Sequence, residues 1–309
     1  MEYCEIEKNQ SRLTVRNYGH YLRRFAEYGK QHGITRPEDI TLDTIRSFRL
    51  ALNRMEADNG RNLKLVTQQY HVIALRAFLK YLIKRDVKTL APEKIELAKT
   101  PSREVSVLNA GEVSRLIKAV EQEKSEILRL RDRAILLTLF SSGVRISELT
   151  SLRTGGVNLE RGEFTVRGKG DKLRLAFLSP HAVTALKAYL KKRADNNPAL
   201  FVSHTKVGNT VTKQMEAHSA PKDGKTIGLT QRSVQRMIKK YALIAGIMHK
   251  VSPHTFRHSF ATDLLQNGAD IRSVQSLLGH ASITTTQIYT HITNQGLRDV
   301  HRKFHNKDN

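Results

Sequence analysis

The sequence contains almost no cysteine. Among its 309 residues there is one, Cys4. A single thiol cannot form a disulfide within the chain or supply a cysteine-based zinc site, and we interpret Cys4 as incidental. The fold must therefore depend on apolar cores, and the length is sufficient for two domains, each with a core of its own.

Long apolar runs are also missing. The first residues contain no apolar segment of the kind found in a secretion signal, and no uninterrupted apolar stretch approaches the length of a membrane span. No short-period repeat or low-complexity tract occurs. We therefore expect a soluble, cytoplasmic protein without membrane contacts.

Acidic residues are scarce relative to basic ones. The chain has 52 Lys and Arg against 29 Asp and Glu, a formal net charge of +23. Residues 1–100 hold 19 basic and 12 acidic side chains, and residues 101–309 hold 33 and 17, so both halves are basic. A positive field over the whole chain suits a polyanion that contacts both halves, and nucleic acid is the obvious one. By composition alone, a ribosome-associated or merely basic protein fits about equally well.

The apolar periodicity divides the chain into two domains. Before residue 88, apolar residues recur at three- and four-residue steps, which predicts helices around residues 18–28, after Thr41 and around residues 70–82. Residues 89–106 contain Pro92 and Pro101 in a polar stretch, which predicts a linker. We therefore expect a helical domain over 1–88 and a second domain over 107–309.

The second domain is predicted to be mostly α-helical with one small antiparallel sheet. Asn109 followed by Glu112 is typical of a helix start, and the apolar segment before Gly143 predicts a buried helix that ends there. Residues 162–177 alternate with a period of two around a glycine-rich turn, which predicts a β-hairpin. Further helices are expected near 181–196, 230–246, 253–268, 270–279, 284–292 and 295–305, and a long polar loop over 203–228.

Two pairs of side chains in this domain are suited to binding a phosphate. Ser252 and Pro253 predict a helix start, which places His254 and Arg257 on one face of its first turn, at the positive end of the helix dipole. Arg145 follows the predicted helix end at Gly143, and Glu148 lies three residues beyond it. Each pair also has an ordinary explanation: a surface pair for the first and a structural ion pair for the second.

Three more residues complete a candidate site. Lys169 lies between glycines at the predicted hairpin tip, His280 follows a predicted helix C-cap at Gly279, and Tyr289 lies in a threonine-rich segment. Taken singly, a solvated lysine, a common helix ending and a buried tyrosine are the more ordinary explanations, and Lys172 and Arg174 compete with Lys169. Together with Arg145, His254 and Arg257 they supply the groups that can bind a phosphodiester, attack it and protonate its leaving oxygen.

The order of these six residues resembles that of the tyrosine recombinase (phage integrase) family. Its pattern is an arginine, a hairpin lysine, HxxR, a histidine or tryptophan, and a tyrosine. The segment 252–291 and the tail 297–301 are especially similar to the Xer branch, and the spacing from Arg145 in that branch favours Lys169 over Lys172. The chain departs from the pattern in a longer loop at about 56–65 and in the polar stretch 203–228.

The resemblance implies a fold and a reaction. The fold is an N-terminal SAM-like core-binding domain and an α-rich catalytic domain with a small antiparallel sheet. The catalytic residues are Arg145, Lys169, His254, Arg257, His280 and Tyr289. Tyr289 attacks the DNA phosphate to form a 3′-phosphotyrosine, and a Holliday junction follows; no metal or other cofactor is needed. Glu148 is expected to orient the groups around the site.

The resemblance also implies partners and a cellular role. It implies double-stranded DNA, a homotetramer or heterotetramer that exchanges the C-terminal helix 295–305, and a nucleoid-associated location. It suggests resolution of chromosome or plasmid dimers, and it allows an activating translocase as a further partner. A mobile-element integrase with the same chemistry and a non-catalytic DNA-binding regulator are the alternatives; the SAM-like first domain argues against a type IB topoisomerase.

Overall fold

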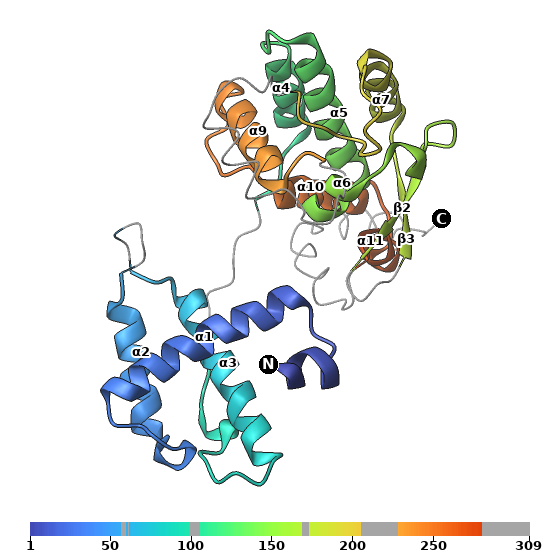
Figure 1. Ribbon diagram of the computed structural model, residues 1–309. Helices are drawn as coiled ribbons and strands as arrows, with labels where there is room; N and C mark the ends of the chain where they lie inside the picture. Colours follow the sequence, from blue (N-terminus) through green and yellow to red (C-terminus); the bar gives the residue numbers. More distant parts are fainter. Residues whose placement is uncertain (57–59, 61, 99–105, 169–172, 205–227, 280–309) are drawn as a thin grey trace, which may run out of the picture. The chain divides into compact units, whose positions relative to one another are not determined.

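The chain forms two compact units, Met1–Arg103 and Glu104–Asn309. The computed structural model describes residues 1–56, 60, 62–98, 106–168, 173–204 and 228–279 (Figure 1). Each unit has its own apolar core, so each is described separately. No helix within these ranges is both long and apolar enough to cross a membrane.

The first unit is helical throughout its described part. Its three main helices are α1 (Arg12–Gln31), α2 (Leu42–Arg54) and α3 (Leu65–Ile83), with short helical turns at Tyr3–Glu7, Pro37–Asp39 and Pro92–Lys94. Hydroxyl N-caps begin α1 and α2: Ser11 accepts from the amide of Thr14, and Thr41 from that of Thr44, both at 3.2 Å. The apolar faces meet in a core that includes Phe25, Phe48, Leu52, Leu75 and Leu79.

The second unit packs helices against a small sheet. Its helices are α4 (Ala110–Val120), α5 (Glu126–Ser142), α6 (Ile146–Ser151), α7 (Pro180–Lys192), α9 (Gln231–Ile244), α10 (Pro253–Gln266) and α11 (Ile271–Leu278). Its strands β1 (Val157–Asn158), β2 (Glu163–Arg167) and β3 (Leu173–Phe177) form an antiparallel sheet in that order. Helix α5 is the central element: it packs against α4, α7 and α10, and Ile135, Leu136 and Leu139 on it are completely buried.

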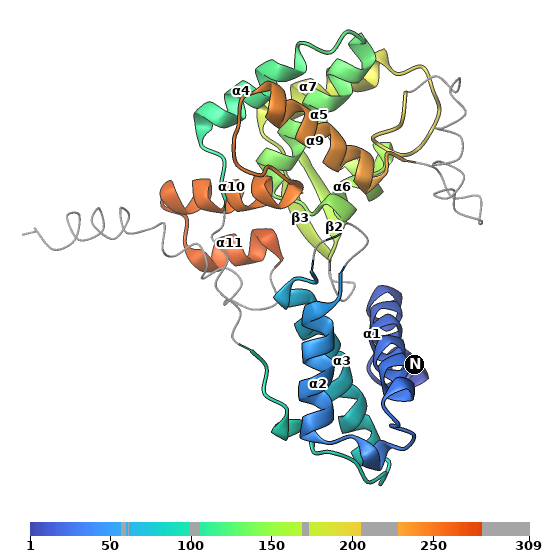
Figure 2. The ribbon, with the colours of Figure 1, turned by 90° about the vertical axis from the view of Figure 1, so that its left-hand side faces the viewer.

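Helices α10 and α11 and strand β3 lie next to one another and surround the candidate site. The two helices run side by side (Figure 2), joined by a small apolar cluster of Ala261, Val274 and Leu278. Helix α11 also contacts β3 (Figure 1). Strand β3 therefore meets helix α11, which lies far from it in the sequence and packs against α10.

The predicted fold class, mostly α with a small antiparallel sheet, is confirmed. The two-residue strand β1 was not predicted, because two residues are too few to show an alternating pattern. Helix α5 starts at Glu126, before the predicted apolar segment. Helix α7 ends at Lys192, short of the predicted end at 196, because the side chain of Arg193 donates to the carbonyls of Ala199 and Leu200. The helices expected at 284–292 and 295–305, and most of the loop 203–228, lie outside the described residues.

Candidate active site

Arg145 is placed by the sharp end of helix α5. The helix ends at Gly143, which has φ +58°, a left-handed conformation that suits glycine. A Cβ on Gly143 would also lie 2.4 Å from Cδ1 of Phe260 on α10, so glycine is required there for two separate reasons. The chain then turns at once into α6, with Arg145 at its N-cap. The side chain of Arg145 is left 29% exposed.

Glu148 is the buried carboxylate to which this arginine binds. Its side chain is 3% exposed and accepts three hydrogen bonds. Oε2 accepts from the amide of Arg145 at 2.7 Å and from Nη2 of Arg174 at 2.7 Å, and Oε1 accepts from Nη1 of Arg145 at 2.9 Å. The expected pairing of Arg145 with Glu148 is present, and Glu148 also binds a second guanidinium, which was not expected.

His254 and Arg257 lie in the first turn of α10. The hydroxyl of Ser252 caps this helix by accepting from the amide of Thr255 at 3.4 Å, and Pro253 occupies its first position. Arg257 is 4% exposed; its Nη1 donates to the carbonyl of Gly143 at 2.6 Å, and its Nη2 donates to the carbonyl of Leu278. These bonds connect the start of α10 with the ends of α5 and α11.

The C-terminal carbonyls of α11 accept from Arg145, Arg174 and Arg257, which we call the arginine cluster. Arg174 donates to the carbonyl of Leu277 at 2.8 Å, Arg257 to that of Leu278, and Arg145 to that of Gly279 at 3.2 Å. The C-terminus of a helix carries partial negative charge, which stabilises nearby guanidiniums. Three consecutive carbonyls thus fix three guanidiniums that come from separate parts of the chain.

The arginine cluster is positively charged overall. It holds three guanidiniums and one carboxylate, that of Glu148, which accepts from Arg145 and Arg174, so these four groups carry a formal charge of +2. Burial and the positive charges of Arg257 and Arg145 lower the pKa of His254. Burial, His254 and Arg257 lower the pKa of His258 to about 4. Near neutral pH both imidazoles are therefore uncharged. The positive charge of the site comes from the guanidiniums, and this charge favours binding of an anion.

Four of the seven predicted site residues lie in the described part of the chain. Arg145, Glu148 and Arg257 come together through the end of α11, and the charges of Arg145 and Arg257 act on His254. Lys169, His280 and Tyr289 lie outside the described residues. The roles of all seven residues therefore stay predictions.

Arg174 is the residue of this cluster that sequence reasoning missed. It was considered only as a competitor of Lys169, whereas its side chain is 9% exposed and binds Glu148. A signal for it existed in the sequence. Arg174 shares one face of β3 with the buried Ala176, and a charged residue on the buried face of a strand requires a buried partner.

Comparisons with known proteins identify the class of protein. The model of the phage integrase family matches residues 106–295, and that of the phage integrase N-terminal SAM-like domain matches residues 1–86. Tyrosine recombinase XerD of Listeria monocytogenes serotype 4b is 34% identical, with 99% of this chain and 96% of that protein covered. Tyrosine recombinase XerA of Pyrococcus furiosus is 36% identical, with 96% and 90% covered.

A solved structure adds a match in three dimensions. The chain resembles XerH site-specific recombinase, solved bound to palindromic difH substrate as a post-cleavage complex, with a TM-score of 0.70 and 26% identity over 97% of this chain and 82% of that one. The chain therefore belongs to the phage integrase family and is a Xer-like tyrosine site-specific recombinase, an enzyme that breaks and rejoins DNA.

Proposed function

We propose that this recombinase cleaves each DNA strand with Tyr289 and holds the scissile phosphate with Arg145 and Arg257. Tyr289 attacks phosphorus and becomes linked to the 3′-phosphate, and the 5′-oxygen leaves with a proton from Lys169. His280 donates a hydrogen bond to the phosphate, and Glu148 orients Arg145. The convergence of Arg145 and Arg257 on the consecutive carbonyls of Gly279 and Leu278 carries this proposal, because it brings both arginines to the two residues before His280.

The charge of the arginine cluster supports this chemistry. A phosphodiester carries one negative charge, and the five-coordinate transition state of its displacement carries two. The formal charge of +2 in the described cluster matches the transition state better than the ground state. Preformed donors that match a developing charge lower the barrier, because they need no rearrangement during the reaction.

His254 is suited to remove the proton from the tyrosine. Although part of its side chain is exposed, burial of the rest and the neighbouring Arg257 and Arg145 lower its pKa. At neutral pH the imidazole is therefore neutral and can accept the phenolic proton. In the rejoining step the imidazolium formed in this way returns its proton to the leaving tyrosine oxygen, and Lys169 accepts the proton of the attacking 5′-hydroxyl.

We propose that both domains bind double-stranded DNA. Residues 1–88 form the core-binding domain, 89–106 the linker and 107–309 the catalytic domain. The division of the chain between Arg103 and Glu104, the family matches to 1–86 and 106–295, and the excess of basic residues in both halves support this assignment. Because phosphate contacts supply much of the affinity, binding should weaken steeply with added salt.

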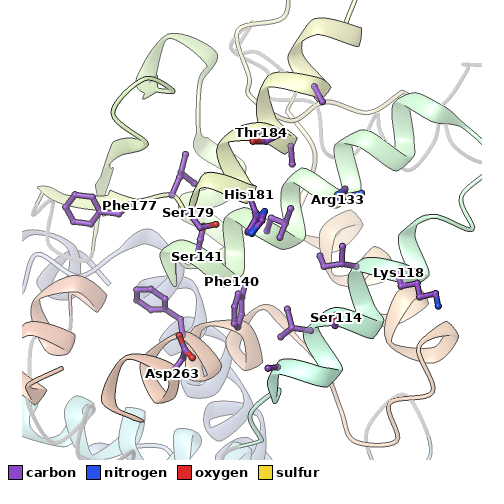
Figure 3. Close-up of a pocket in the computed structure, with 18 of the residues that line it drawn as sticks. Ser114, Lys118, Arg133, Phe140, Ser141, Phe177, Ser179, His181, Thr184 and Asp263 are labelled. Atoms are coloured by element: carbon purple, nitrogen blue, oxygen red, sulfur yellow. The ribbon is translucent and has the colours of Figure 1, made fainter. Parts of the chain in front are cut away.

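The active assembly in this proposal is a tetramer of one or two kinds of subunit that exchange C-terminal helices. The predicted helix 295–305 lies outside the described residues, but its sequence places Leu297, Val300 and Phe304 on one face. The catalytic unit has a groove of about 1100 Å³ between α4, α5, α7 and α10 (Figure 3), with Phe140 and Phe177 in its wall. An apolar groove of this kind suits an amphipathic helix from a neighbouring subunit.

The biological role we propose is resolution of chromosome or plasmid dimers in the cytoplasm, at the nucleoid. The relatives XerD and XerA, which match nearly the whole chain, support a Xer-type role over integration of a mobile element. An activating translocase fits the same role. Recovery of covalent protein–DNA adducts from cells would identify the site: one chromosomal or plasmid site supports the role, and adducts at the ends of a mobile element refute it.

A nicked suicide substrate tests the chemistry. The wild-type protein should form a covalent DNA adduct, also in the presence of a chelator of divalent ions, and Tyr289→Phe should form none. An adduct that persists in Tyr289→Phe would refute the nucleophile, and loss of cleavage on chelation would refute the metal-independent reaction. Deletion of residues 294–309 should abolish cooperative assembly on paired sites.

A further inference from the structure

Arg174 lies where strand β3, helix α6 and the end of α11 meet. We propose that Arg174 is a positioning residue of this active site, which holds Glu148 and the end of α11 so that Arg145 and residue 280 are aligned for the reaction. The proposal rests on the function proposed above. It deepens that function, because it assigns a role to a residue outside the six predicted catalytic positions.

The contacts of Arg174 all point inward. Nη2 donates to Oε2 of Glu148 at 2.7 Å, and Nη1 donates to the carbonyl of Leu277 at 2.8 Å. The side chain is 9% exposed, so its guanidinium is not available to bind a DNA phosphate directly. An arginine placed in this way acts through its neighbours.

The first neighbour is Glu148. Its carboxylate accepts from Arg174 through Oε2 and from the Arg145 side chain through Oε1. Arg174 therefore fixes the plane of the carboxylate that in turn orients the guanidinium of Arg145. If Arg174 were removed, Glu148 would lose one of its two guanidinium partners, and Arg145 would be free to follow the carboxylate as it turned.

The second neighbour is the end of α11. Gly279 ends this helix with φ +64°, and a Cβ on it would lie 2.8 Å from Cδ and 3.0 Å from Nε of Arg174. The Arg174 side chain thus occupies the space beside Gly279, while its guanidinium holds the carbonyl of Leu277. Both contacts restrain the backbone immediately before His280, so Arg174 aligns two predicted catalytic positions at once.

An arginine is better suited to this position than a lysine. The planar guanidinium can donate in two directions at once, to a carboxylate and to a carbonyl, whereas an ammonium is a compact point charge. Burial lowers the pKa of Arg174, and Glu148 opposes this change. An arginine remains charged under such burial because its ordinary pKa is high, but a lysine with the same burial readily loses its proton.

The test compares Arg174→Lys with Arg131→Lys in the full-length protein. Arg131 is a similarly buried arginine of the same unit, 8% exposed, that pairs with Asp132. For each variant, strand-cleavage rate on the nicked suicide substrate, DNA affinity and thermal midpoint are measured. Arg174→Lys should cleave roughly 100-fold more slowly, because small misalignments of reacting groups have effects of that size, with DNA affinity close to wild type. Arg131→Lys should lower the thermal midpoint without that loss of rate.

A second variant separates positioning from folding. Arg174→Ala should recover cleavage when millimolar guanidinium is added, with no matching change in the thermal midpoint. If Arg174→Lys cleaves like wild type, or if its loss of rate follows its loss of folded protein as in Arg131→Lys, the positioning role is refuted while the proposed function stands. If the wild-type protein forms no adduct at all, the proposed function fails and the positioning role with it.

Discussion

Two buried arginine networks in the catalytic unit differ in how their charges are balanced. In one, which we call the balanced network, Arg131 and the phenol of Tyr241 both donate to Asp132, so one positive charge meets one negative charge. In the other, the arginine cluster, Arg145 and Arg174 share the carboxylate of Glu148, and Arg257 donates to backbone carbonyls. Both networks join distant segments, but only the second keeps an excess of positive charge.

This difference in charge balance distinguishes a network that stabilises the fold from a site that can bind an anion. Burying a charge is unfavourable unless it is paired, and the balanced network meets this condition. Burial and the charge of Asp132 raise the pKa of Tyr241, so its phenol stays protonated as a donor. The arginine cluster relies instead on the C-terminal carbonyls of α11, which offset part of the excess and leave the remainder for a phosphate.

The largest expected effect is on catalysis. Arg257→Lys should lower the rate of strand cleavage by about 100- to 1000-fold, because it removes a preformed donor for the transition state. Arg131→Lys should leave the rate per folded molecule within about threefold, because Arg131 binds Asp132 and the carbonyl of Val202, which are not partners of the arginine cluster, and sites without shared partners act nearly independently. Equal losses of rate in the two variants would abolish the distinction between the networks.

Removal of the two buried carboxylates sharpens the comparison. Glu148→Gln and Asp132→Asn should each lower the free energy of unfolding by about 3 kcal/mol, because each leaves a buried guanidinium without its partner charge. Denaturant titration measures this quantity. Only Glu148→Gln should also slow cleavage by the protein that remains folded. Cleavage at the wild-type rate by Glu148→Gln would contradict its role in orienting Arg145.

Gly143, which ends helix α5 just before Arg145, can be compared with Gly246, a second glycine with positive φ. Gly143→Ala should destabilise by about 1–2 kcal/mol through its positive φ and by about 1–3 kcal/mol more through the contact with Phe260. Gly246 has φ +65° with nothing within 4 Å of a Cβ, so Gly246→Ala isolates the first effect. The difference in free energy of unfolding between the two variants reports the packing of α10 on the end of α5. Similar losses of stability would mean that Phe260 moves aside without cost.

The effect expected to be smallest near neutral pH is the pH dependence of stability. The pKa of His258 is lowered to about 4, whereas in an unfolded chain it is about 6.5. Between these values the unfolded chain binds a proton that the folded chain does not, so stability is complete above about pH 6.5 and falls as the pH drops toward 4. His258→Asn should flatten this part of the stability profile. His204→Asn, beside the balanced network, should also flatten this profile, because burial and the charge of Arg131 lower the pKa of His204 too, and denaturant titration at a series of pH values measures both changes.

Much of this fold could be predicted from local sequence. The hydroxyl caps at Ser11, Thr41 and Ser252, the glycine at 143 and the alternation across 162–177 each act within a few residues, so the chain shows them directly. The two-residue strand β1 is different: it exists because β2 lies beside it, and its own residues contain too little pattern to predict it.

The candidate site divides in the same way. The pairs Arg145–Glu148 and His254–Arg257 were visible because helix geometry brings residues three apart onto one face. The role of Arg174 was not visible, because its partners are Glu148 on α6 and Leu277 on α11, and only folding brings these segments to strand β3. The local chemistry was thus determined by the order of residues along the chain, whereas the convergence of three arginines on three consecutive carbonyls was decided by the packing of α5, α6, α10, α11 and β3.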